Sequence, residues 1–264
     1  MFRRVLKYQL FFRSLAGVLL LILFKVVADH MGWSIITINT LTSAFFGGVF
    51  FVLGIIMAGV VADFKEAEKV PSEFSVLLKA IRHDSHLLLG GSVCAQERDG
   101  IVLHVEELLS SINSNFRNNH WHKHEVDKII NDINADVATL WQQGAPTGVL
   151  MKIRDNLTGI DRLSHRVDYI AKTSFLPAAY FVVEIGVFLV LLIFVFAKNE
   201  WGFGGVLLFA AIGFILLSLI QLIRDIDNPF EVGKNSCADV DLSVLFKLEN
   251  LWLEKRKLAN CDTV

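Results

Sequence analysis

Long uncharged apolar runs near both ends of the sequence constrain this chain more than any other feature. Three segments have the length and composition of a membrane-spanning helix, which takes about 20 residues: Thr37–Ala62, Ser174–Phe196 and Phe203–Ile223. A fourth, Leu15–Trp33, contains Lys25 and Asp29 at the spacing of an i,i+4 ion pair, and Lys25 can alternatively extend toward the membrane surface. A composition that is 53% hydrophobic with 21 phenylalanines agrees with lipid exposure. The sequence therefore predicts an all-α integral membrane protein with four transmembrane helices.

The stretch between the second and third spans has the composition of an ordinary water-exposed helical region. It contains only two prolines, Pro71 and Pro146, and apolar residues recur at helical spacing, as in Phe74, Leu78 and Ile81. We therefore expect five segments: an N-terminal cytosolic segment at 1–14, transmembrane helices 1 and 2 at 15–62, a helical cytosolic region at 63–172, transmembrane helices 3 and 4 at 173–224, and a cytosolic C-terminal tail with an amphipathic helix at 225–264.

The distribution of basic residues predicts the orientation in the membrane. Lysine and arginine cluster before the first span, between Lys65 and Lys172, and after Arg224, whereas the two short connections on the other side carry almost none. By the positive-inside rule, both termini lie in the cytoplasm of a cell whose inner (plasma) membrane holds the protein. The first span also resembles a secretory signal, with Ala28 placed for cleavage, but its removal would leave three spans and break this charge pattern.

Several function classes lack the residues that they require. The net charge is -2 and the basic residues are interspersed with acidic ones, which argues against nucleic acid as a partner. His120 and His124 have metal-ligand spacing on a helix, but no HExxH or Cys-x-x-Cys arrangement accompanies them, so solvated histidines are favoured. Nucleotide-binding and hydrolase motifs are absent from the sequence as well. We predict no enzymatic activity, no cofactor and no metal site.

The second span combines a polar end, bulky apolar groups and many small residues. One of its faces, at steps of three and four, carries these side chains: Asn39, Ser43, Phe46, Phe50, Leu53 and Met57. Glycines such as Gly47, Gly48 and Gly54 allow neighbouring backbones to approach closely. Such a helix can line a narrow pore whose apolar rings gate by dewetting, or it can be an ordinary packed helix of a bundle.

Glu184 lies within the third span, where lipid cannot solvate an ionised carboxylate. It must therefore be protonated or closely partnered. One interpretation is a proton or cation role in transport, and the other is a structural hydrogen bond between helices.

Two stretches of the sequence form recognisable motifs. One is Val61–Pro71, directly after the phenylalanine-rich second span, and the other is the Asp-x-x-Asn-Pro-Phe run formed by Asp225, Asn228, Pro229 and Phe230. Both stretches resemble the bacterial bestrophin-like family, distant relatives of the bestrophin anion channels. The order of four spans with a helical insertion in the middle is similar too. The resemblance covers the membrane halves and the tail, whereas the insertion agrees only in its helical type.

The resemblance implies a homo-pentamer that conducts small inorganic anions, chiefly chloride, through a pore lined by the second span. Carried over by register, the hydrophobic rings of the bestrophin neck fall on Phe46, Phe50 and Gly54, while Asn39, Ser43 and Met57 complete the predicted lining. Membrane lipid and other copies of the chain are the expected partners. Two alternatives remain: a non-conducting scaffold or sensor whose cytosolic helices bind another protein, and a proton- or cation-coupled transporter that uses Glu184.

Cysteine labelling tests the predicted topology. Ile35→Cys and Glu200→Cys should react with a membrane-impermeant thiol reagent in intact cells, because both positions lie on the side away from the basic residues. His120→Cys should react only after the cells are lysed. Labelling of His120→Cys in intact cells would overturn the orientation.

Overall fold

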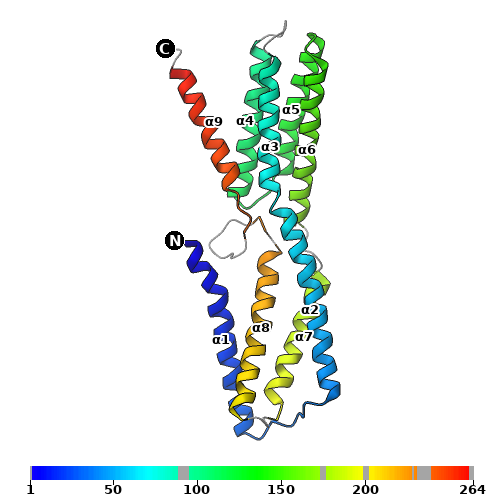
Figure 1. Cartoon of the computed structure of the whole chain (residues 1–264), viewed down its shortest axis with the longest axis vertical. Helices are drawn as coiled ribbons and strands as arrows, with labels where there is room; N and C mark the ends of the chain where they lie inside the picture. Colours follow the sequence, from blue (N-terminus) through cyan, green and yellow to red (C-terminus); the bar gives the residue numbers. More distant parts are fainter. Residues whose placement is uncertain are drawn as a thin grey trace. The chain divides into compact units, whose positions relative to one another are not determined.

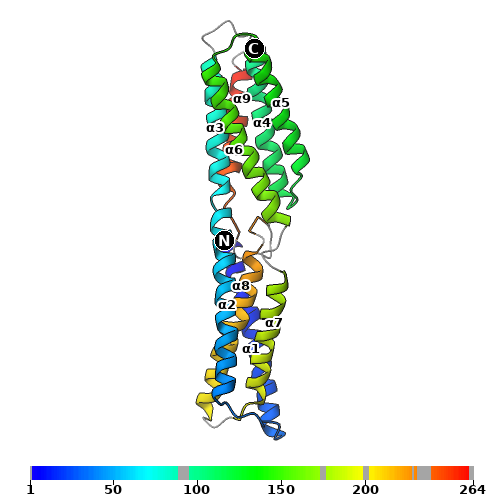
Figure 2. The same cartoon turned by 90° about the vertical axis from the view of Figure 1, so that its right-hand side faces the viewer.

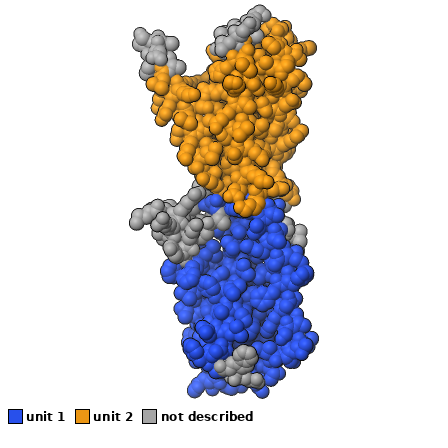
Figure 3. Space-filling model, viewed as in Figure 1, with its two compact units in different colours: residues 1–64, 174–229, 233–239 blue, residues 65–173, 230–232, 240–264 orange. Residues whose placement is uncertain are grey.

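Helices account for almost all of the computed structural model, which describes residues 2–88, 95–172, 177–198, 202–227, 229–230 and 239–261 (Figure 1). The chain divides into two compact units (Figure 3). The membrane unit comprises Met1–Phe64, Ser174–Pro229 and Gly233–Asp239. The second unit comprises Lys65–Thr173, Phe230–Val232 and Val240–Val264.

The membrane unit contains four helices that are long and apolar enough to cross a bilayer. They are α1 (Phe2–His30), α2 (Thr40–Ala67), α7 (Pro177–Phe196) and α8 (Phe203–Ile226). By length and composition, they confirm the expectation of a four-span, all-α membrane protein. The first helix ends at His30, earlier than the predicted Trp33, because the chain turns at Gly32, whose φ of +71° favours glycine.

Small residues let the four spans approach one another. A Cβ atom added to Gly17 of α1 would come within 2.9 Å of a terminal methyl group of Leu217 on α8, so the Leu217 side chain would have to shift. A Cβ atom added to Gly186 of α7 would likewise lie 3.3 Å from the side chain of Val49 on α2. Such small-residue contacts are typical of helices in lipid, where packing replaces the hydrophobic effect as the main attraction.

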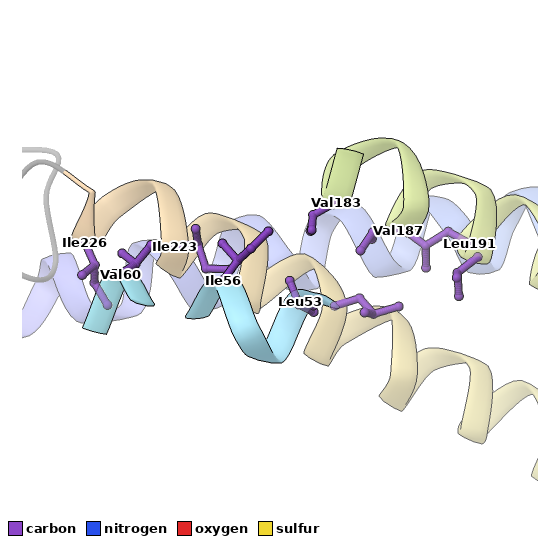
Figure 4. Close-up of a cluster of buried hydrophobic side chains, with 10 residues drawn as sticks. Leu53, Ile56, Val60, Val183, Val187, Leu191, Ile223 and Ile226 are labelled. Atoms are coloured by element: carbon purple, nitrogen blue, oxygen red, sulfur yellow. The ribbon is translucent and has the colours of Figure 1, made fainter. Parts of the chain in front are cut away.

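An apolar cluster joins α2, α7 and α8 (Figure 4). Leu53, Ile56 and Val60 of α2 lie at helical spacing on one face and are buried. They pack with these side chains of α7 and α8: Val183, Val187, Val190, Leu191, Leu216, Ile223 and Ile226. One face of α2 is therefore committed to packing within the chain.

The second unit is a bundle built from five helices (Figure 2). They are α3 (Val70–Leu87), α4 (Ala95–Arg117), α5 (Lys123–Gln142), α6 (Thr147–Lys172) and α9 (Ser243–Cys261). Pro71 lies in the first turn of α3, where its missing N–H costs nothing. Gly144, with a φ of +82°, and Pro146 separate α5 from α6. The predicted apolar stripe at Phe74, Leu78 and Ile81 is fully buried, which confirms its assignment to a core face.

The tail helix α9 packs on α3 and α4 through its apolar face and one acidic side chain. Glu249 is only 8% exposed, and it accepts hydrogen bonds from Asn113 at 2.9 Å and from Arg117 at 2.6 Å. The Arg82 guanidinium lies 4.6 Å from the ring centroid of Trp252, as a cation–π contact. These contacts fix α9 to its own bundle.

Core truncation in the second unit should be costly. Ile153 of α6 is fully buried, so Ile153→Ala should lower the free energy of unfolding by about 2–5 kcal/mol. Leu103→Ala, on an exposed part of α4, is the matched control and should change it by less than about 0.5 kcal/mol. Denaturant titration in detergent measures both, and equal losses would contradict the assigned core.

Candidate functional site

The start of α2 is fixed by a side-chain cap. The Asn39 carboxamide oxygen accepts a hydrogen bond from the Thr42 backbone N–H at 3.0 Å, and the Thr42 hydroxyl lies 2.8 Å from the Asn39 backbone N. This reciprocal arrangement satisfies N–H groups that have no partner within the helix. Asn39, predicted to line the pore, is therefore also the residue that caps the N-terminus of α2, and Ser43 is exposed on the first turn.

The structure divides the predicted pore-lining face of α2 between two environments. Phe46 stacks on Phe194 of α7 with ring centroids 4.8 Å apart, and Met57 packs against the apolar cluster described above. Leu53, on the same predicted face, is buried in that cluster. Phe46 and Met57 thus lie in contacts within the chain, whereas Phe50 and Gly54 lie on the exposed side.

The most exposed bulky side chains in the middle of α2 are Phe51 at 69% and Ile55 at 57%, compared with 38% for Phe50. Phe51 and Ile55 are four residues apart and so form one ridge. A Cβ atom added to Gly47, Gly48 or Gly54 would meet no other atom within 4 Å. The exposed face of α2 therefore carries a Phe51–Ile55 ridge with open, small positions beside it.

Sequence reasoning missed Phe51 and Ile55. Almost every residue from Phe45 to Val61 is apolar or small, so hydrophobic periodicity does not distinguish the face that packs inside the chain from the face that is open.

Glu184 has a partner in the membrane unit. The Arg224 guanidinium donates two hydrogen bonds to one oxygen of Glu184, at 2.8 Å from Nε and 2.5 Å from Nη2. Nearby, the Tyr180 hydroxyl and the Asp227 carboxylate are 2.6 Å apart. Tyr180 and Glu184 are one turn apart on α7, and Arg224 lies one turn before Asp227, which caps the end of α8. The two contacts therefore form a polar clamp between these helices.

The residues of the Asp-x-x-Asn-Pro-Phe run have different surroundings. Asp225 is half-buried, Pro229 is buried, and Asn228 lies outside the described residues. Phe230 is buried against Phe116 of α4, with ring centroids 5.6 Å apart. Phe230 is thus a core side chain of the second unit.

Within the described part of the chain, no three His, Cys, Asp or Glu side chains gather as a metal site would require. His120 stacks on His122 at 4.2 Å, and His104 is hydrogen-bonded to Asp136 at 2.7 Å. His122 precedes the first turn of α5, so the helical pairing of His120 with His124 considered from the sequence does not occur.

Solved structures with the same fold are bacterial bestrophin homologues. One from Klebsiella pneumoniae, carrying a single mutation, has a TM-score of 0.77 at 14% identity and covers 92% of this chain and 98% of its own. Another single mutant from the same organism gives a TM-score of 0.74 at 16% identity, with 93% and 98% coverage. A third structure of the homologue gives 0.73 at 15% identity, with 90% and 96% coverage. No protein-family model and no curated protein matches the sequence. The resemblance found in the sequence is confirmed at the level of the fold, which is bestrophin-like.

A double-mutant cycle tests the polar clamp. Glu184→Gln and Arg224→Gln should each destabilise the protein. Because both substitutions remove the same interaction, the double mutant should show a coupling free energy of about 0.5–3 kcal/mol. Lys198→Gln, after the far end of α7, should be additive with Glu184→Gln. Unfolding titrations in mixed micelles measure the stability of the wild type, the two single mutants and the double mutant. Full additivity of the Glu184 and Arg224 substitutions would contradict the clamp.

Proposed function

We propose that this chain forms a homo-oligomeric membrane channel, a homo-pentamer by its resemblance to bestrophins, whose α2 helices surround an axis that conducts small inorganic anions such as chloride. The observation that carries the proposal is the exposed face of α2. There, the Phe51–Ile55 ridge lies beside glycines that are open to close approach, on a chain with a bestrophin-like fold.

The exposed face of α2 suits contact with other copies of the chain better than contact with lipid. Among the described helices, α2 makes few close backbone contacts with the other spans, so much of its surface is uncovered in a single chain. Open positions at Gly47, Gly48 and Gly54 let neighbouring helices approach closely. A ring of α2 helices would bury this face and bring the ridges of all copies together.

A ring of ridges can act as a gate. Phe51 and Ile55 are apolar, so a narrow constriction that they form would exclude water until it widens. This proposal moves the hydrophobic neck by one residue from the positions expected from the sequence. Phe50 remains beside the ridge, and Phe46 stays in the packing with Phe194.

Transport that depends on Glu184 is less well supported than a passive pore. A proton or cation site needs a carboxylate that can release its partner, whereas Glu184 accepts two hydrogen bonds from Arg224, whose guanidinium stays charged. We therefore assign Glu184 to the clamp between α7 and α8.

One observation favours a scaffold as the second candidate. A cleft of about 490 Å³ opens between α5 and α6, and Trp141 and Met151 line it while being at least half exposed. An exposed aromatic beside a methionine suits the binding of a partner protein. A scaffold of this kind needs no current through the membrane unit.

We place the protein in the inner (plasma) membrane with both termini and the second unit in the cytoplasm. The support is the positive-inside distribution of lysine and arginine, which agrees with four spans. The second unit would then receive or deliver ions and partners on the cytoplasmic side.

Recordings from planar bilayers test the channel. Wild-type protein should conduct, with chloride favoured over sodium, and Phe51→Ala should raise the conductance because it widens the apolar constriction. Phe46→Ala is the matched control, since it removes a phenyl ring that packs within the chain. It should lower stability, because the ring loses its stacking on Phe194, without raising the current.

Each outcome separates the candidates. A gain of current in Phe46→Ala but not in Phe51→Ala would return the neck to the position expected from the sequence. Silent wild type and silent Phe51→Ala, from protein shown by light scattering to be an intact oligomer, would reject the channel and leave the scaffold as the better account.

A further inference from the structure

At the end of the membrane unit where α1 connects to α2 and α7 connects to α8, a buried lysine holds the two connections together. The Lys25 ammonium donates to Asp29 at 2.7 Å, and it also contacts the Ser34 hydroxyl and the Ala197 carbonyl oxygen. A short bridge between Ile36 and Ala197 adds backbone hydrogen bonds across the same two segments. This network closes the end of the unit around a fixed positive charge.

A cavity of about 470 Å³ lies against this network. Its walls are largely apolar and come from α2, α7, α8 and the segment before α2: Ile38, Phe46, Phe194, Leu208 and Phe209. Its polar lining consists of Lys25, Thr37 and Lys198, and Gly205 leaves room on the α8 side. The cavity has the size of a small-molecule site, is open on one side, and is surrounded by helices that lie in the bilayer.

Among the described charged groups at the cavity, one ammonium group has no ion-pair partner. Lys25 is matched by Asp29, whereas no carboxylate among the described residues lies within ion-pair distance of Lys198, which is exposed. Among the described residues at the cavity, two ammonium groups therefore face one carboxylate. The end of the spans is the depth at which lipid headgroups meet acyl chains, so an anionic group there is attracted without entering the hydrocarbon.

We propose that the cavity binds an anionic glycerophospholipid, with its phosphate at Lys198 and part of one acyl chain between Phe46, Phe194 and Phe209. A free inorganic anion fits these walls poorly, because phenyl rings cannot replace its water shell. An uncharged lipid would leave the Lys198 ammonium unmatched. The proposed site does not depend on whether the protein conducts ions.

Native mass spectrometry of the purified full-length protein tests the site. The probes are phosphatidylglycerol and phosphatidylcholine with the same acyl chains, titrated into delipidated protein in mild detergent. The wild type should bind phosphatidylglycerol more tightly than phosphatidylcholine, with one high-affinity site per chain. Lys198→Gln should weaken phosphatidylglycerol binding about fivefold, the attraction of one ammonium group for an anionic lipid, and leave phosphatidylcholine unchanged.

A cavity-filling variant tests the apolar part of the site. Gly205→Leu places a side chain in the cavity and should weaken the binding of both lipids. Gly204→Leu is the matched control, because a side chain on this neighbouring glycine meets open space and the residue does not line the cavity. Lys152→Gln, on an exposed position of α6, controls for the loss of a positive charge. Both controls should bind lipid as the wild type does.

Three results would overturn the proposal. Equal binding of the two lipids by the wild type, or unchanged phosphatidylglycerol binding in Lys198→Gln, would show that the headgroup is not recognised. Equal losses in Gly204→Leu and Gly205→Leu would show that lipid only coats the helices. Dissociation of the oligomer by Gly205→Leu with lipid binding unchanged would show that another copy of the chain fills the cavity.

Discussion

Lipid cannot solvate a charge, and the arrangement of the membrane unit depends on this constraint. Two charged groups of the spans have polar partners: Lys25 bonds Asp29 and the Ala197 carbonyl oxygen, and Arg224 bonds Glu184. The contacts of Lys25 with Ala197 and of Arg224 with Glu184 also join segments that are distant in the sequence. Apolar packing alone has no directional preference, whereas these polar contacts form only between particular residues. The contacts therefore help to specify which helices pair.

The sequence was sufficient to predict those features of the fold that have a strong period or a strong composition. The four spans follow from apolar length, and the buried face of α3 at Phe74, Leu78 and Ile81 follows from helical spacing in a polar background. Lys25 and Asp29 could be paired because their spacing is local. The partner of Glu184 is a different case, because Arg224 is 40 residues away and only the fold brings them together.

The candidate pore shows where sequence reasoning stops. In α2 nearly every position is apolar or small, so Phe46, Phe50 and Phe51 are equivalent in composition and differ only in the direction in which the helix presents them. That direction is determined by which face packs on α7 and α8. A resemblance to a distant family supplies the motif but not the register, and a shift of one residue rotates a helical position by about 100°.

The bridge between Ile36 and Ala197 has a consequence for biosynthesis. The Ala197 carbonyl oxygen that accepts from Lys25 lies 172 residues further along the chain, so the ribosome completes the whole second unit except its tail before this acceptor exists. Until then, the first two helices enter the membrane with Lys25 neutralised only by Asp29, one turn away. The pair formed by α1 and α2 therefore lacks this acceptor until α7 and α8 are inserted.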